Sequence, residues 1–451
     1  MTAQPDSMQG HASNTDFAAL CKQYTLYEWS AQATVDPMPI VRAKGVYMWD
    51  VNGKRYLDFN SQSVYMNIGH ADERIADAVS QQMRTLPALS PFQASMVRGL
   101  LGERLAEVAP PGLTKSFFTL GGTDANEAAI RIARQVTGRH KIITRYRSYH
   151  GSSQGALFAS GDPRRWANEA GMGGIVRVHD PYRYRCSWCS QSDACDMRCL
   201  SSIEEVVNLE GPETIAAIMV EPITGSNGII VPPDGWLTGL RQLCDRYGLL
   251  LIADEVMSGF GRTGSWFAVN HEGVIPDLMT VGKGITSGYV PLGACIVSDR
   301  VADFYQSNTL WAGLTYNSHP VACAAALANL QVYQTDGLIE NSRLMGEKLL
   351  QELNRLKAQH RSVGDVRGRG LFAVLELVED RETRRPLIPF PGPASKVLSA
   401  MQKTMRDNGV VAATRGSLIF ACPPLCVSQD ELQEGIDAID AALLIADAAV
   451  N

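Results

Sequence analysis

The sequence predicts an α/β protein, in which a large domain is built on a mostly parallel sheet flanked by helices. A smaller α+β domain is expected from the N-terminal segment together with the C-terminal part. The chain has 451 residues, 45% of them hydrophobic, which is enough for a large core divided between two domains. Two short apolar runs, Leu249 to Ala253 and Leu278 to Val281, stop abruptly at polar or glycine residues. Such runs are typical of strands buried in a parallel sheet.

The ends of these runs carry reactive side chains. The first stops at Asp254, the second at Lys283 between two glycines, and a third run from residue 214 ends at Glu221. Open α/β sheets hold their ligands at the carboxyl ends of the strands, so we expect the three groups at one edge. A lysine that forms a Schiff base and an aspartate that keeps a ring nitrogen protonated are what pyridoxal phosphate requires. The alternative is a surface lysine in a loop and an aspartate that caps a helix.

A longer ordered pattern surrounds these residues. It consists of Asp254-Glu255-Val256, GFGRTG at 259–264, Pro276-Asp277 and Gly282-Lys283-Gly284. This pattern resembles the signature of class III aminotransferases, the ω-aminotransferase branch of the fold-type I pyridoxal enzymes, and the resemblance covers nearly the whole chain. It implies that pyridoxal 5'-phosphate is the cofactor, that Lys283 is catalytic, that Asp254 binds the ring nitrogen, and that Val256 packs under the ring.

A phosphate site is predicted at the start of a helix. Residues 116–120 are expected to form a strand, Gly121-Gly122-Thr123 a tight turn, and Asp124 the start of a helix. A helix N-terminus offers free backbone N–H groups and the positive end of the helix dipole. We therefore assign the cofactor phosphate to Gly122 and Thr123, whose hydroxyl adds a donor.

Two further cofactor contacts follow from the resemblance. Tyr149-His150-Gly151 is similar to the family element in which an aromatic ring stacks on the pyridine face. We choose Tyr149 as the stacking residue, with His150 as the alternative. A third reading gives Tyr149 no contact with the cofactor and makes it a buried residue whose hydroxyl is hydrogen-bonded. The resemblance places Glu221 near the ring oxygen, where it orders the residues around it.

Substrate contacts are expected from a loop and a hairpin. The resemblance implies that the loop 60–70 reaches the active site and that Ser61, Val64 and Tyr65 face the substrate; the alternative is an ordinary loop. Arg415, in a predicted hairpin turn, is expected to bind the carboxylate of the acceptor through a two-pronged contact. The alternative is a solvated arginine in a turn.

Thr315 carries the prediction about assembly. The resemblance implies that this threonine reaches the phosphate of the neighbouring subunit, which would make the protein a homodimer with shared active sites and leave pairing into tetramers open. A residue near a helix N-terminus that satisfies backbone donors is the alternative.

We expect four segments along the chain. They are a disordered polar tail at 1–16, an N-terminal segment of the small domain at 17–70, the large cofactor-binding domain at 71–334, and the C-terminal part of the small domain at 335–451. Asn52-Gly53 lies between apolar alternations, a strong hairpin signal.

The C-terminal part contains three local predictions. Residues 361–378 are expected to form a strand, and 410–425 a hairpin that turns at Arg415-Gly416. The last helix opens with Ser428 and Glu431, the pattern of a capping box.

Composition excludes other classes of partner. The net charge is −6 and no basic face is apparent, so nucleic acid is not suggested. No apolar stretch approaches the roughly 18–20 residues of a membrane helix. The first residues lack the charged and apolar regions of a signal peptide, which favours a cytoplasmic location.

One cysteine cluster is left open. Cys186, Cys189, Cys195 and Cys199 have a plausible spacing for a four-thiolate zinc or iron–sulfur site. The second pair is CxxxC rather than CxxC and the inner loop is short, which argues against a metal. We assign no metal site, and disulfides, a metal and free thiols remain alternatives.

The resemblance is greatest to taurine and ω-amino acid aminotransferases, through YTLYEWSAQ near the start, GDPRRW at 161–166 and VGDVRGRGLF at 363–372. We therefore expect transfer of an amino group from taurine, β-alanine, 4-aminobutyrate or a similar donor to pyruvate or 2-oxoglutarate. One alternative is an amine:pyruvate transaminase for non-acidic amines. Another is a pyridoxal racemase, lyase or decarboxylase, since the same lysine and aspartate serve these reactions. A metal-binding regulatory protein that uses the cysteines is the alternative outside enzymes.

Overall fold

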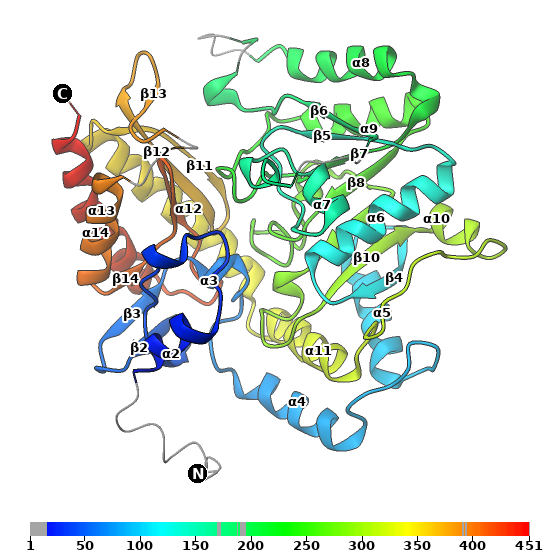
Figure 1. Cartoon of the computed structure of the whole chain (residues 1–451), viewed down its shortest axis with the longest axis horizontal. Coiled ribbons are helices and arrows are strands. Elements are labelled where there is room, and N and C mark those ends of the chain that lie inside the picture. Colours follow the sequence, from blue (N-terminus) through cyan, green and yellow to red (C-terminus); the bar gives the residue numbers. More distant parts are fainter. Residues whose placement is uncertain are drawn as a thin grey trace.

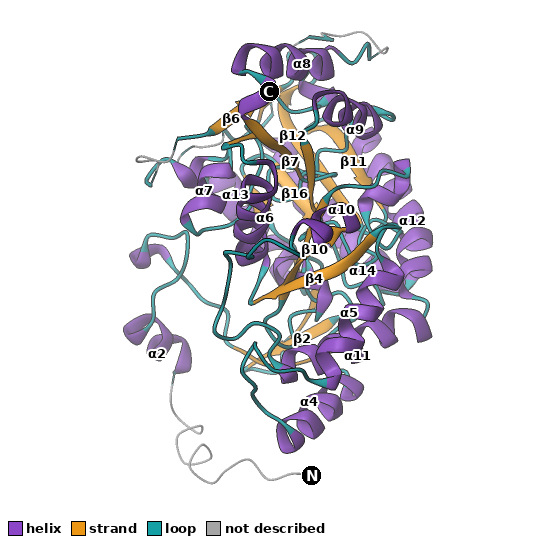
Figure 2. Ribbon diagram, turned by 90° about the vertical axis from the view of Figure 1, so that its right-hand side faces the viewer, coloured by secondary structure: helices purple, strands orange, loops and turns teal. Residues whose placement is uncertain are grey.

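The computed structural model describes residues 16–168, 173–186, 188–189, 195–389, 392 and 395–450. The predicted disordered tail at 1–16 lies outside the described residues except for Asp16. That residue caps α2 (Phe17–Tyr24), because its side chain accepts a hydrogen bond from Ala19 N. No residue of α2 is buried, and Figure 2 shows this helix at the edge of the molecule.

A seven-stranded sheet is the largest sheet of the described chain and lies in the right-hand part of the view in Figure 1. Its strands, in order across the sheet, are β4 (Leu113–Thr119), β10 (Gly293–Ser298), β9 (Leu278–Val281), β8 (Leu250–Asp254), β7 (Ile215–Val220), β5 (Lys141–Arg145) and β6 (Ile175–Val178). β10 is antiparallel to both of its neighbours, whereas the pairs from β9 to β6 are all parallel. The predicted mostly parallel sheet is confirmed.

Both faces of this sheet are covered, which explains why its central strands are uninterrupted apolar runs. Leu250 and Ile252 of β8 belong to an apolar cluster with α6 (Gly122–Thr137) and α10 (Asp299–Phe304). Leu251 and Ala253 belong to a second, larger cluster. That cluster takes in α5 (Met96–Val108), α8 (Arg198–Glu210), α9 (Trp236–Tyr247) and α11 (Pro320–Thr335).

Two smaller sheets lie beside the large one (Figure 1). The first has the order β1 (Ile40–Lys44), β2 (Tyr47–Asp50), β3 (Arg55–Asp58) and β14 (Val410–Val411). The second has the order β11 (Val363–Arg369), β12 (Phe372–Asp380), β16 (Leu418–Ala421) and β15 (Thr414–Arg415), with β13 (Arg385–Pro386) paired to β12. β2 and β3 form the hairpin predicted at Asn52-Gly53, and β14 pairs in parallel with β3, which joins the two ends of the chain.

The remaining elements are shorter or lie outside these sheets. The helices are α3 (Ser61–Val64), α4 (Glu73–Thr85), α7 (Gln154–Ala159), α12 (Leu338–Gln359), α13 (Lys396–Asp407) and α14 (Gln429–Ala448). The 3-10 turns are η1 (Gln32–Thr34), η2 (Pro163–Arg165), η3 (Arg183–Arg185), η4 (Pro212–Thr214), η5 (Ala268–Glu272) and η6 (Lys283–Ile285). The predicted capping box is present at the start of α14, with Ser428 and Glu431 bonded reciprocally.

The expectation of one strand over 361–378 is wrong, because the chain reverses within it to form β11 and β12. The turn contains Gly370 at φ +58°, and a Cβ there would lie 2.4 Å from the carbonyl carbon of Thr263. Only glycine combines this backbone conformation with so close an approach. In the predicted 410–425 hairpin, β15 and β16 do pair around Gly416, but β14 joins the other small sheet instead. The boundaries of the two domains stay a prediction.

The buried arginine of the GFGRTG pattern connects distant parts of the chain. Arg262 is fully buried, and its Nη1 donates to the carbonyl oxygens of Leu371 and Pro423. Its Nη2 donates to Ser61 Oγ and Asn67 Oδ1. One guanidinium therefore holds the loop after β3 against both the large sheet's loops and the C-terminal part.

The structure also bears on membrane helices, on the cysteines and on metal sites. Within the described ranges, no helix is both long and apolar enough to cross a membrane. All ten cysteines are free thiols, and the Sγ atoms of Cys189 and Cys195 are 3.9 Å apart. In the part of the chain that the structure describes, no group of three or more His, Cys, Asp or Glu side chains is arranged to hold a metal ion.

Candidate active site

A cavity of about 450 Å³ lies at the carboxyl ends of the central strands. β7, β8 and β9 end there and deliver Glu221, Asp254 and Lys283 to its wall, as their shared direction predicts. The predicted residues that line this cavity are Val64, Gly122, Thr123, Tyr149, Glu221, Asp254, Val256, Lys283 and Arg415. The structure thus brings together side chains from both the large sheet and the smaller sheets.

Lys283 stands at the end of β9 in an unusual backbone conformation. Its φ is +46°, which is uncommon for a residue with a side chain and is typical of strained positions at functional sites. Burial lowers the pKa of its amine, while the carboxylates of Asp254 and Glu221 oppose that shift. The amine consequently loses its proton at a lower pH than an exposed lysine, as a nucleophile or general base requires.

Asp254 is held in one orientation by a set of buried hydrogen bonds. Its Oδ2 accepts from Asn126 Nδ2 at 2.8 Å and lies 2.6 Å from His150 Nδ1. Its Oδ1 accepts from Val256 N at 3.0 Å. Asn126 is fixed in turn, since its Oδ1 accepts from Thr280 Oγ1 at 2.6 Å. Sequence reasoning missed Asn126, although it lies one turn into the helix that carries the phosphate site.

The same contacts bear on the choice between Tyr149 and His150. The ring of His150 is buried against Asp254, on which its Nδ1 is engaged. Tyr149 is only partly buried, and its backbone N donates to Glu221 Oε1 at 3.1 Å. Glu221 Oε2 also accepts from Gly225 N at 2.7 Å, and burial raises the pKa of this carboxyl. Both residues line the cavity, and the choice of Tyr149 as the stacking ring stays a prediction.

The other end of the cavity is a cradle at the start of α6. This helix begins at Gly122 without a side-chain cap, so its first backbone N–H groups have no capping side chain. A Cβ on Gly122 would lie 2.5 Å from Val256 Cγ1, and a Cβ on Gly151 would lie 2.5 Å from Thr123 Oγ1. The two glycines therefore permit a close approach of three segments around a helix N-terminus, the kind of place where proteins bind anions, and the assignment of the phosphate to it stays a prediction.

Arg164 is a lining residue that sequence reasoning missed. Its guanidinium carbon lies 3.4 Å from the ring centroid of Tyr149 and 5.4 Å from that of Trp29, another missed lining residue. Contacts of this kind between an arginine and an aromatic face are cation–π interactions. Arg164 stands in the string GDPRRW and Trp29 in YTLYEWSAQ. Both strings contribute to the family resemblance, but nothing in them indicates that the two side chains meet at the cavity.

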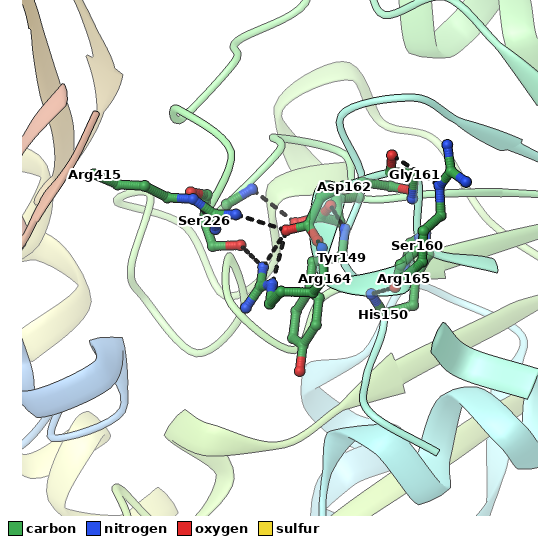
Figure 3. Close-up of polar contacts among 12 residues, drawn as sticks. Tyr149, His150, Ser160, Gly161, Asp162, Arg164, Arg165, Ser226 and Arg415 are labelled. Carbon is green, nitrogen blue, oxygen red and sulfur yellow. Dashed lines mark hydrogen bonds and ion pairs between the residues drawn. The ribbon is translucent and has the colours of Figure 1, made fainter. Parts of the chain in front are cut away.

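Arg415 meets Arg164 at a common carboxylate (Figure 3). Its Nη2 donates to Asp162 Oδ2 at 2.8 Å, and its Nη1 donates to the carbonyl oxygen of Ser226 at 3.3 Å. Its side chain is 19% exposed, so the alternative of a solvated arginine in a turn is wrong. The cavity wall therefore contains two guanidinium groups.

Three residues predicted to belong to the site, Ser61, Tyr65 and Thr315, do not line the cavity. Ser61 is fully buried, donates to the carbonyl oxygen of Cys422 at 2.6 Å and accepts from Arg262, so its expected substrate contact is corrected to a structural one. Tyr65 does not line the cavity, because its ring packs against Gly288, where a Cβ would lie 2.4 Å from Tyr65 Cδ2. From the same loop, Asn60 and Ser63 line the cavity beside Val64.

Thr315 is exposed and does not line the cavity of its own chain. It borders a separate surface groove with Pro91 and Phe92. The alternative role at a helix N-terminus is wrong, because α11 begins only at Pro320, with His319 as its N-cap.

The geometry agrees with a comparison to known proteins. The family model for class III aminotransferases matches residues 29–443, and the chain belongs to this family. The hypotaurine/taurine–pyruvate aminotransferase of Paracoccus denitrificans (strain Pd 1222) is 34% identical, and the match covers 91% of this chain and 92% of that protein. The putrescine–pyruvate aminotransferase of Pseudomonas aeruginosa (strain PAO1) is 33% identical, with 88% of each chain covered.

A solved structure is similar throughout. The taurine:2-oxoglutarate aminotransferase from Bifidobacterium kashiwanohense, in complex with pyridoxal phosphate and glutamate, superposes with a TM-score of 0.92 at 38% identity and 99% coverage of both chains. The protein is therefore a pyridoxal-phosphate-dependent transaminase of class III. The cavity fits this cofactor, because it combines a lysine amine, an ordered carboxylate and a cradle for a phosphate.

Proposed function

We propose that this enzyme transfers the amino group of an ω-amino acid such as taurine, β-alanine or 4-aminobutyrate to pyruvate or 2-oxoglutarate. The observation that carries the proposal is the pair Arg164 and Arg415 in the wall of the cavity that also contains Lys283. An amine with an anionic group at its other end matches this cavity twice, because its amine can react at the end that contains Lys283 and its anion can bind the guanidinium groups. Guanidinium groups form charge-assisted, often two-pronged hydrogen bonds with carboxylate and other oxyanions.

When bound, pyridoxal phosphate supplies an aldehyde that condenses with amines and a ring that accepts electrons. The residues proposed to hold it are Gly122 and Thr123 at the phosphate, Tyr149 and Val256 at the two ring faces, Asp254 at the ring nitrogen, and Glu221 near the ring oxygen. Asn126 and His150 support this assignment, because both contact Oδ2 of Asp254 and so fix the orientation of the carboxylate, while the contact of Oδ1 is with the backbone N of Val256.

Lys283 Nζ is proposed to move the proton that leaves the substrate carbon next to the amine. A general base must be unprotonated before it can accept, and burial lowers the pKa of this amine. The same nitrogen would then return this proton within the site, and water would have to enter and release the carbonyl product before the half-reaction is complete. Reversal with an oxo acid then restores the starting state.

The anionic end of the donor is proposed to bind Arg164, whose guanidinium carbon lies 3.4 Å from the ring centroid of Tyr149 and 5.4 Å from that of Trp29. These cation–π contacts favour one orientation of the guanidinium beside the two rings. Val64, which is 4% exposed, adds an apolar surface along the cavity wall for the methylene groups of the substrate. The taurine–pyruvate and taurine:2-oxoglutarate activities named for similar proteins support this class of donor.

A second candidate is an amine:pyruvate transaminase for donors without an acidic group. The relative named putrescine–pyruvate aminotransferase favours it, since putrescine carries no anion. In that case Arg415 would serve only the oxo acid. A relative named leucine/methionine racemase, 32% identical, is the reason to test whether turnover requires an oxo acid at all.

The test is a panel of donors assayed with pyruvate and with 2-oxoglutarate. Taurine, β-alanine and 4-aminobutyrate are compared with putrescine and 1-phenylethylamine, each with the oxo acid omitted as a control. We expect the acidic donors to have a kcat/KM at least about tenfold higher, and Arg164→Met to lower it about 10- to 100-fold for them alone, as the loss of one charged hydrogen-bonding partner predicts.

Arg165→Met is the matched control, because Figure 3 shows the neighbouring arginine directed away from Arg415. A preference for neutral amines would contradict the proposal, as would an equal effect of Arg164→Met on every donor. Product formed without an oxo acid would indicate racemase or lyase chemistry instead.

The enzyme is further proposed to act as a homodimer in which Thr315 completes the site of the partner. Exposed apolar side chains surround this threonine: Phe92 is 97% exposed, Trp311 75% and Tyr316 62%. Such a concentration of large apolar groups is typical of an interface with another chain. A second copy of this chain is the occupant that the shared-site arrangement requires.

Sedimentation of the double variant Phe92→Glu/Trp311→Glu tests the dimer. We expect monomers with little activity, because charges in an apolar interface are not paired. Leu209→Glu, at an 80% exposed position on α8, is the control that should leave the assembly unchanged. An unaltered sedimentation coefficient in the double variant would refute this interface, and a larger assembly in the wild type would indicate a tetramer.

A further inference from the structure

Asp162 lies behind the cavity wall and contacts both arginines. It is 1% exposed and does not line the cavity. Its Oδ2 accepts from Arg164 Nε at 2.8 Å, from Arg164 Nη2 at 2.5 Å and from Arg415 Nη2 at 2.8 Å. A single carboxylate oxygen is thus the point at which the two guanidinium groups meet (Figure 3).

The two arginines come from different parts of the fold. Arg164 lies in η2, after the helix α7, and Asp162 also accepts from its backbone N at 2.8 Å. Arg415 lies in β15 of the five-stranded sheet. Ser226 touches both, since its Oγ accepts from Arg164 and its carbonyl oxygen from Arg415. Asp162 therefore joins a loop of the large sheet to a strand of a smaller sheet.

The two guanidinium groups keep the carboxyl of Asp162 ionised, although it is buried. Burial alone would raise the pKa of Asp162, but Arg164 and Arg415 outweigh it and hold that pKa below its ordinary value. Burial and the nearby charge of Arg164 lower the pKa of Arg415, while Asp162 opposes that shift. The carboxylate is thus ionised at neutral pH and separates two positive charges that would otherwise repel each other.

We propose that Asp162 is a positioning residue that sets the substrate charge which the cavity accepts. Two guanidinium groups and one carboxylate leave a single net positive charge, which matches one sulfonate or one carboxylate at the end of the substrate. A second anionic group on the same substrate finds no third guanidinium in the described lining, so pyruvate should be preferred over 2-oxoglutarate as acceptor. This inference rests on the proposed binding of anionic substrates by Arg164 and Arg415.

Asp162→Asn tests the charge at constant shape. The variant raises the net charge of the site by one unit, so we expect the ratio of kcat/KM for dianionic 2-oxoglutarate over monoanionic pyruvate to rise about tenfold or more. The change should lie in KM rather than kcat, because Asp162 does not touch the reacting atoms. The acceptor ratio is measured with 1-phenylethylamine as donor, so it does not depend on whether taurine is a substrate.

Two further variants, Asp162→Glu and Arg415→Met, separate an effect of charge from an effect on folding. Asp162→Glu keeps the charge and should hold the acceptor ratio within about threefold of the wild type. Arg415→Met lowers the net charge to zero and should move the ratio in the direction opposite to Asp162→Asn, which keeps the test decisive if Asp162→Asn does not fold.

Asp72→Asn is the matched control. Asp72 holds Arg74 through the same local pattern, with its Oδ1 accepting from the backbone N of Arg74 at 2.9 Å and its Oδ2 from Nη2 at 2.6 Å, but it does not line the cavity. Its substitution should leave the acceptor ratio unchanged.

A binding measurement without turnover completes the test. Calorimetric titration with ethanesulfonate and with ethane-1,2-disulfonate should show that Asp162→Asn favours the dianion relative to the wild type. An acceptor ratio unchanged in a folded, cofactor-loaded Asp162→Asn variant would overturn the proposal, as would an equal shift in Asp162→Glu. If the wild type rejects every acidic donor but the ratio still shifts, the proposed function fails while this inference stands.

Discussion

Gly122→Ala should weaken the binding of the cofactor through a single added methyl group. A Cβ at this position would lie 2.5 Å from Val256 Cγ1, 2.9 Å from its Cγ2 and 3.3 Å from its Cβ. Rotation of Val256 about χ1 does not remove the conflict, because the other methyl group is also too close. Valine is β-branched and stiff, so the backbone after Asp254 has to move instead.

The size of the effect follows from this overlap. Forcing a methyl group into a well-packed site costs about 1–3 kcal/mol. If the strain is relieved mainly by displacing Val256 from the proposed ring site and the start of α6 from the proposed phosphate site, cofactor affinity falls about 5- to 150-fold. Stability should fall by less, since the apoenzyme has room to relax into the cavity.

The assay is a titration of dialysed apoenzyme with pyridoxal phosphate, followed by visible absorbance. Gly121→Ala is the matched control, because a Cβ on Gly121 has nothing within 4 Å and its φ of −179° is open to any residue. The double variant Gly122→Ala/Val256→Ala removes the methyl groups that overlap and should recover most of the affinity. Equal affinities for the wild type and Gly122→Ala would refute this reasoning, and so would a failure of the double variant to recover any affinity.

Two other predictions concern the strand ends. Lys283→Ala should lower turnover about 10²- to 10⁴-fold or more, since no other lysine among the described residues lines the cavity. Borohydride reduction and peptide mass spectrometry should trap the cofactor at residue 283 in the wild type. A variant that still cycles at a tenth of the wild-type rate contradicts the role. Burial raises the pKa of Glu255 to about 7. The native state therefore keeps this proton to a higher pH than the unfolded chain, so its contribution to stability is full below about pH 4.5 and is lost as the pH rises towards 7. Glu255→Gln should flatten the loss of stability between pH 5 and 8 by on the order of 3 kcal/mol, measured by urea unfolding; parallel curves for variant and wild type would disprove it.

Several features of the site follow from local sequence alone. The runs that end at Glu221, Asp254 and Lys283 are buried strands, and parallel strands place their carboxyl ends at one edge whatever the rest of the chain does. The glycine turn before Thr123 is likewise local, because a strand, a tight turn and a helix start are adjacent along the chain. These residues meet because the three strands run in the same direction, and uninterrupted apolar runs are typical of such parallel, buried strands.

The contacts among Arg164, Arg415 and Asp162 could not be predicted in the same way, although the sequence does predict that Arg415 binds a carboxylate. Asp162 and Arg415 are 253 residues apart in sequence, and neither stands at the end of a predicted strand of the large sheet. Ser61 shows the opposite error: a residue in the correct loop is turned away from the cavity, because Arg262, 201 residues further on, uses its hydroxyl.

The sequence by itself determined the sheet, its reactive edge and the cofactor chemistry, because strand burial and strand direction are recorded in short runs of neighbouring residues. Only the tertiary structure decided which further polar side chains line the cavity beside these strand ends. That choice depends on hydrogen bonds between segments that are remote in sequence, and no local pattern records which partner a buried guanidinium or hydroxyl finds.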